Sequence, residues 1–203
     1  MNALWGQILV EAAETLHTMQ PGAQVIVREV LAGDALRPLR SGDVDVMCAG
    51  YPLDGEDVTI GPALLQERAL LVVSADHPFA HRESVSPEDL AEVALLSTPT
   101  MPAAWTRARS PDTTPSGVPI PRGPVATSIH QALALITLGH GAFVFGDKCM
   151  AYHRHPGRAA IPISDFPAIE WGLVHLDCAR TPLLQAFSQV AAALAHDHAN
   201  HPG

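Results

Sequence analysis

The chain has 203 residues, 47% of them hydrophobic, which suffices for one domain of ordinary size or two small lobes. Its formal net charge of −9, with histidines neutral, argues against direct binding to a nucleic-acid backbone. No apolar run reaches the length of about 18 residues that a membrane span needs. The first residues carry Glu11 and Glu14 and no basic segment, unlike a secretory signal. We therefore expect a cytoplasmic protein with no membrane partner.

Apolar residues recur at helical spacing near the N-terminus, and β-branched residues are concentrated directly after them. These patterns predict the following elements in chain order: a helix over 3–19, a strand over 23–30, a short helix over 32–43 that contains Pro38, a buried strand over 44–50 and a long strand over 63–75.

The second half of the chain continues to alternate between the two kinds of pattern. It predicts a helix over 86–93, a strand over 94–98, a proline-rich loop over 99–124 with one helical turn around Trp105, a helix over 128–138, a strand over 142–145, a helix from Asp147, strands over 158–164 and 169–177, and a C-terminal helix over 181–199. Alternating strands and helices predict parallel sheets with helical crossovers. The long strands 63–75 and 169–177 bracket the middle of the chain, as two strands that cross between two lobes would.

Several segments in order resemble the effector-binding domain of LysR-type transcriptional regulators. They are "LRPLRSGDVDVMCAG", "LLQERALLVVSADHPFAHRESVSPEDLAEVALLST", "VATSIHQALALITLGHGAFVFG" and "IEWGLVHLDCARTPLLQAFSQVAAAL", which together span most of the chain. The resemblance implies an α/β fold of two Rossmann-like lobes joined by two crossing strands, similar to type 2 periplasmic binding proteins. Residues 1–73 and 174–203 would form lobe I, and residues 74–173 would form lobe II.

The stretch Asp76-His77-Pro78 follows the first long strand and matches a turn of that family. Pro78 cannot donate to a β-ladder, so it ends the strand. An adjacent Asp and His are a weak signal for catalysis. We therefore interpret this stretch as a turn, and we expect no catalytic residues, no metal site and no cofactor.

Ligands of such α/β sheets lie at the carboxyl ends of strands, against helix N-termini. This rule selects eight candidate ligand-binding residues: Ala32, Gly33, Ser97, Thr98, Thr127, Ser128, Phe145 and Gly146. Thr127 and Ser128 are the strongest pair because both offer hydroxyl groups, although Ser128 could serve only as a helix cap. Many family members have Pro at the position of Gly146 and Ser or Thr at that of Ala32, which leaves the ligand class open.

The resemblance implies a ligand-sensing module that binds a small organic effector between its lobes and pairs with itself as a homodimer or tetramer. DNA would be bound only through an N-terminal winged helix-turn-helix that is not present in this chain. The pairing surfaces would be helices 3–19 and 128–138, through Trp5, Leu9, Leu135 and Leu138. The alternative is a free-standing cytoplasmic small-molecule-binding protein, or a truncated remnant of such a regulator.

Cys149 follows a strand–helix junction, where a thiol could have a lowered pKa. Peroxide-sensing members of the family carry their reactive thiol before the position of Thr127, but residues 99–126 contain no cysteine. A redox sensor is therefore not expected.

The family has a central strand before the first helix, and helix 3–19 lies almost at the start of this sequence. In the family's strand order the missing strand would lie between segments 24–30 and 44–49. We expect an empty slot between these segments rather than a direct ladder. We also expect this chain alone to bind its effector weakly or not at all, and upstream residues to restore stability and binding.

Overall fold

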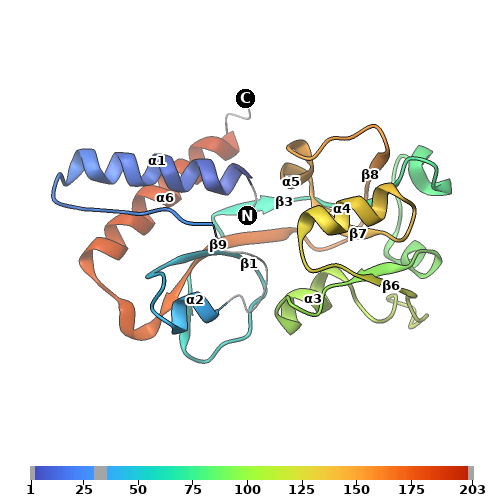
Figure 1. Ribbon diagram of the computed structural model, residues 1–203, viewed down its shortest axis with the longest axis horizontal. Coiled ribbons are helices and arrows are strands. Elements are labelled where there is room, and N and C mark those ends of the chain that lie inside the picture. The colour runs from blue at the N-terminus through green and yellow to red at the C-terminus, as the bar shows by residue number, and fades with distance from the viewer. Residues whose placement is uncertain (1–2, 30–35, 201–203) are drawn as a thin grey trace.

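The computed structural model describes residues 3–29 and 36–200, and it shows two lobes side by side (Figure 1). One lobe carries α1 (Ala3–Met19), α2 (Arg37–Arg40), β1 (Met47–Gly50), β9 (Ile169–Leu176) and α6 (Pro182–Asn200). The other carries α3 (Ala103–Arg109), β6 (Arg122–Val125), α4 (Ile129–Thr137), β7 (Phe143–Gly146), α5 (Asp147–Ala151) and β8 (Arg158–Pro162). This arrangement confirms the predicted two-lobed α/β fold.

The first lobe is built around β9, which pairs antiparallel with β1, β2 (Val58–Ile60) and β3 (Leu65–Glu67). The predicted N-terminal helix is confirmed as α1, which packs along α6. Trp5, Ile8 and Leu16 of α1 are fully buried, together with Ala191 and Ala195 of α6. The helical spacing of these residues explains both the helix and the face that it buries.

The second lobe is built around β4 (Ala69–Ser74), which lies between β7 and β8. Every residue of β4 is buried, so both faces of the strand are covered. Leu71 and Val73 pack into one apolar cluster, and Leu70 and Val72 pack into another with α4. This alternation follows from the two-residue repeat of a β-strand.

The prediction of parallel sheets is wrong for most strand pairs. β4 runs antiparallel to both its neighbours, as β9 does to its three, and among the described strands only β5 (Leu95–Ser97) and β6 pair in parallel. The predicted strand 63–75 is also broken at Arg68. The backbone N–H and side chain of Arg68 bind the carboxylate of Asp147, so Arg68 belongs to neither ladder.

Two predicted helices are shorter or tighter than expected. Residues 86–93 form a 3-10 helix (Pro87–Glu92), with a capping box between Ser86 and Asp89. Within residues 32–43, α2 alone is helical among the positions that the structure describes. The fold also contains a 3-10 turn at Asp177–Ala179.

The turn at Asp76-His77-Pro78 is confirmed. His77 caps a 3-10 helix (Pro78–His81), and its Nδ1 accepts a hydrogen bond from the N–H of Phe79 at 3.1 Å. The ring of His77 also meets that of Phe79 edge-on, at 4.9 Å between centroids. These contacts give His77 a structural role.

The sheets show where the chain passes from one lobe to the other. Sheet membership changes at Arg68, between β3 and β4, and it changes back before Ile169, where β9 begins. The division of the chain at residues 73 and 174 stays a prediction. Among the described residues, no helix has the length and hydropathy needed to cross a membrane.

Residues 23–29 are extended, but they form no strand, so the prediction of a strand at 23–30 is wrong over the described positions. A strand is defined by its partner, and no backbone hydrogen bond links residues 24–28 to any described residue. Val25 and Val27 pack against the core of α1 and α6, while Ile26 is 66% exposed. The segment therefore has a strand's side-chain pattern without a ladder.

The space between residues 24–28 and β1 is the slot that the sequence predicts. Within the described residues, β1 pairs with β9 alone. The N–H of Tyr51 donates to the backbone oxygen of Glu170 in β9. In an antiparallel ladder every second residue bonds to the partner strand. The backbone N–H and C=O groups of Cys48 and Gly50 therefore point away from β9. Both segments line one cavity, and no backbone hydrogen bond among the described residues joins them, so they do not pair directly.

Hydrogen exchange should detect the slot. We expect the amides of Gln24–Arg28, Cys48 and Gly50 to exchange at least about tenfold faster than those of Met47 and Ala49, which bond to β9. Residue-resolved exchange by NMR measures this difference. Equal protection of Cys48 and Ala49 would show that the outer edge of β1 is paired in solution.

Candidate ligand-binding cleft

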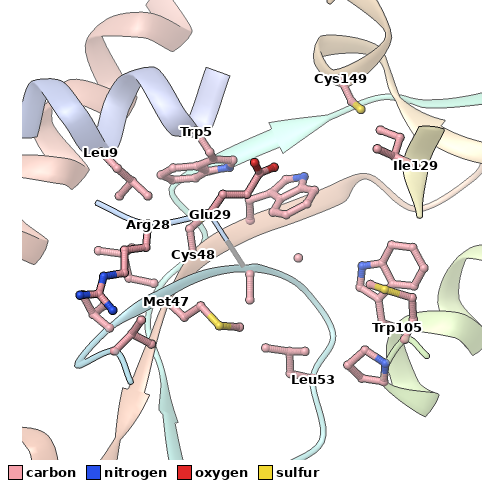
Figure 2. A pocket seen from close by; sticks show the side chains of 18 of the residues that line it. Trp5, Leu9, Arg28, Glu29, Met47, Cys48, Leu53, Trp105, Ile129 and Cys149 are labelled. Atoms are coloured by element: carbon pink, nitrogen blue, oxygen red, sulfur yellow. The ribbon is translucent and has the colours of Figure 1, made fainter. Parts of the chain in front are cut away.

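A cavity of about 660 Å³ lies between the lobes and extends into the slot of the first lobe. Residues 24–29 and 43–50 line it from the first lobe, and residues 126–130 and 143–146 line it from the second. Figure 2 shows Trp5 and Cys48 on one side of this space and Trp105 and Ile129 on the other. Pockets for small organic ligands usually measure about 300–1,000 Å³, so this cavity has the right size for one.

Aromatic side chains form much of the cavity wall. All three tryptophans of the chain, Trp5, Trp105 and Trp171, line it. The ring of Trp105 stacks on Phe143 at 6.0 Å, and Phe143 meets Phe145 edge-on at 5.1 Å. These rings offer flat apolar surfaces to the body of a ligand.

Glu67 is the buried acid of the site, with 2% of its surface exposed. Its Oε1 accepts a hydrogen bond from the backbone N–H of Cys149 at 2.9 Å, and its Oε2 accepts one from Nε1 of Trp171 at 3.0 Å. A buried carboxylate needs such donors because it has lost its hydration. The two donors come from opposite lobes, so Glu67 holds them together.

Position 146 accommodates only glycine because the side chain of Glu67 occupies the space that a Cβ would need. A Cβ at this position would overlap the carboxylate of Glu67. This explains why the chain has glycine at a position where the resemblance leads one to expect proline.

Arg109 is the buried base of the site, with 3% of its surface exposed. Its Nη1 donates to the backbone oxygen of Tyr51 at 3.0 Å, and its guanidinium stacks on the ring of Trp105 at 4.3 Å. Its Nη2 has no hydrogen-bond partner among the described residues. Burial lowers the pKa of Arg109 to about 10, so the side chain stays charged at neutral pH.

The structure places five of the eight predicted residues in the cavity wall. They are Thr98, Thr127, Ser128, Phe145 and Gly146. Ser97 does not line the cavity, and its hydroxyl instead donates to the oxygen of Gly123 at 3.3 Å. Ala32 and Gly33 lie outside the described residues. A role in ligand binding stays a prediction for all of them.

Thr127 and Ser128 also organise the start of α4. The hydroxyl of Ser128 accepts a hydrogen bond from the N–H of Gln131, so the capping role of Ser128 is confirmed. The N–H and hydroxyl of Thr127 both donate to Oε1 of Gln131. Both residues are exposed and line the cavity, so they can serve the helix and a ligand together.

The expectation of a lowered pKa at Cys149 is wrong. Burial raises the pKa of its thiol to about 12, and the nearby Glu67 acts in the same direction. Burial also raises the pKa of Cys48, which lines the first-lobe wall. Both groups are therefore neutral thiols at neutral pH, with little nucleophilic character.

Comparison with known proteins identifies a family. The LysR substrate binding domain matches residues 2–195 of the chain. No curated protein sequence matches the chain significantly.

Solved structures of LysR-family proteins share the fold. The effector-binding domain of QuiR in complex with shikimate matches at a TM-score of 0.74 and 15% identity, covering 94% of this chain and 91% of that domain's chain. The reduced form of OxyR matches at 0.70 and 23% identity, covering 95% and 90%. A full-length OxyR variant from Pseudomonas aeruginosa matches at 0.68 and 20% identity, covering 94% of this chain but 65% of that protein.

The contact between Gly146 and Glu67 predicts a large effect of a small substitution. Gly146→Ala should displace the buried carboxylate from its donors and lower the free energy of unfolding by about 3 kcal/mol. Denaturant titration measures this change. Gly22→Ala is the matched control, because a Cβ there meets nothing within 4 Å.

A double-mutant cycle tests the cause. If the Glu67 side chain is the obstacle, Gly146→Ala should lower the free energy of unfolding clearly less in a Glu67→Ala background than in the wild type. An equal cost in both backgrounds would place the strain elsewhere.

Proposed function

Because the chain belongs to the LysR substrate binding domain family, we propose that it is the ligand-sensing module of a LysR-type transcriptional regulator. It binds a small organic effector between its lobes and thereby controls transcription. The observation that supports this most directly is the cavity of about 660 Å³, whose walls come from both lobes. QuiR, a protein of the same fold, holds shikimate in its effector-binding domain.

A ligand in this cavity controls the relative position of the lobes. Arg109 and Ala104 of α3 already reach the first lobe, through the backbone of Tyr51 and the carboxylate of Asp54. A ligand that contacts both walls favours the lobe arrangement in which it makes the most contacts. The regulator reads this arrangement through its own assembly in the cytoplasm, as a homodimer or tetramer, and binds DNA through a winged helix-turn-helix outside this sequence.

The groups in the cavity support binding rather than catalysis. Both oxygens of Glu67 hold structural hydrogen bonds. The thiol of Cys149 is protonated at neutral pH because burial raises its pKa to about 12. A nucleophile needs the opposite environment, in which the thiolate is favoured.

Effector binding should appear as stabilisation. A screen of small organic metabolites by thermal unfolding is expected to find a ligand that adds about 2.7 kcal/mol at about 100 times its dissociation constant. The double substitution Thr127→Ala and Ser128→Ala should abolish this gain. A full ligand response in the double variant would place the site elsewhere.

The control for this variant is Gln131→Ala. It removes the partner of Thr127 at the start of α4 but leaves both hydroxyls at the cavity. It should lower stability slightly and keep the ligand-induced gain.

Two of the four residues expected at the pairing surface are buried, and Leu138 is exposed as expected. Trp5 and Leu9 are 0% and 9% exposed and belong to the core of the first lobe, so they cannot supply an interface. Val10 and Met19 of α1 are exposed instead, and Leu138 at the end of α4 is 70% exposed. We place the contact between copies on these residues.

Light scattering tests the pairing. Val10→Asp and Leu138→Asp should each shift a dimer towards monomer and leave the fold of the single chain intact, because both side chains face solvent in the single chain. Val118→Asp, at a residue 48% exposed in a different region, should leave the dimer intact. A wild-type monomer at high concentration would contradict this interface.

A further inference from the structure

Arg109 lies at the end of α3, inside the cavity wall, and one of its donor groups is unsatisfied within the described part of the chain. Its Nη1 has a partner, the oxygen of Tyr51, but its Nη2 has none among the described residues. Within the same part of the chain, no carboxylate lies within ion-pair distance of its guanidinium. A buried charged group that lacks one hydrogen bond is costly, so it favours a ligand that supplies an acceptor.

A second donor converges on the same place. Nη2 of Arg109 and Nε1 of Trp105 each lie 3.0 Å from the point that a Cβ on Gly50 would occupy. Because Gly50 has no side chain, both nitrogen atoms lie close to its backbone in the cavity wall, and Nη2 itself is buried there. The hydroxyl of Thr98, which also lines the cavity, is a third polar group without a partner among the described residues.

The remainder of this wall is flat and apolar. Trp105 stacks on Phe143, and Phe143 touches Phe145, so the donors lie at the edge of an aromatic surface. A ligand that suits both features has an anionic acceptor at one end and a planar apolar body behind it.

We propose that the effector is a monocarboxylate with a planar or cyclic apolar body, anchored by Arg109 with Trp105 beside it. This inference rests on the proposed function and names the class of ligand for the same cavity. A carboxylate offers two acceptor oxygens, one for Nη2 of Arg109 and one for Nε1 of Trp105. Nη1 keeps its bond to Tyr51, so one guanidinium joins the ligand to the first lobe.

Glu67 restricts the charge of the ligand. It lines the same cavity, so the described walls carry a buried negative charge as well as a buried positive one. A second carboxylate on the ligand would enter the field of Glu67 with no further buried guanidinium in the wall to balance it. The site therefore favours one negative charge over two.

Matched pairs of probes test the proposal by isothermal titration calorimetry on the chain as it stands. The probes are benzoate and cinnamate, each compared with its uncharged carboxamide, and terephthalate as the dianion. Benzoate and cinnamate should bind at least about tenfold more tightly than their amides, as expected for hydrogen bonds to a charged group. Terephthalate should bind no more tightly than benzoate.

Variants assign the preference to Arg109. Arg109→Gln should remove the advantage of the carboxylates over the amides. Arg107→Gln should keep the advantage, because Arg107 is on the same helix but is 66% exposed and pairs with Asp54 on the surface. Loss of the preference in Arg107→Gln as well would attribute it to the general charge of α3 and overturn the proposal.

A further variant covers the case in which Arg109→Gln does not fold. Gly50→Ala keeps the arginine but places a methyl group where Nη2 and Nε1 converge, so it should weaken carboxylate binding more than amide binding. Equal weakening of both would overturn the proposal. Binding of neutral compounds only would also overturn it while the proposed function stands. No binding by any of these probes would overturn the proposal, and only a metabolite screen that also finds no stabilising ligand would contradict the proposed function.

Discussion

The buried carboxylate of Glu67 is the contact on which the arrangement of the two lobes depends. It lies where the chain crosses between the sheets, and it draws one donor from α5 of the second lobe and one from Trp171 of the first. A charge with 2% exposure cannot be left without partners, so the backbone of Cys149 and the indole of Trp171 are held in fixed positions. The same carboxylate forces glycine at position 146.

This constraint also sets the electrostatics of the cavity. Burial lowers the pKa of Arg109, while the charge of Glu67 raises it, and the balance leaves a guanidinium that is still charged at neutral pH. One buried acid and one buried base thus line a space that is otherwise largely apolar and aromatic. Electrostatic interactions are stronger in such surroundings than in water, so a few polar groups can decide which ligand is accepted.

Features that depend on local patterns could be predicted from the sequence, and features that depend on distant partners could not. The spacing of Trp5, Ile8 and Leu16 identifies α1 because a helix buries its own repeat. Residues 24–28 carry an equally clear strand pattern, but a strand requires a second segment to pair with. Arg109 and Glu67 were missed because charged residues are usually exposed, and the proline-rich composition around α3 indicated a loop. Thr98 and Thr127 could be placed at the cavity wall from the sequence because the rule for strand ends is topological.

The slot and the ligand site are parts of one cavity, and this couples the two. Gln24–Arg28 and Cys48 line the same space as Trp105 and Phe143. A ligand that touches Cys48 and Trp5 therefore also orders the unpaired backbone of the first lobe. Linkage requires the reverse effect to be equally large: any segment that pairs with β1 and orders that backbone changes ligand affinity by the same factor. Under the proposed function, backbone hydrogen bonds that no ligand atom makes would therefore contribute to effector affinity.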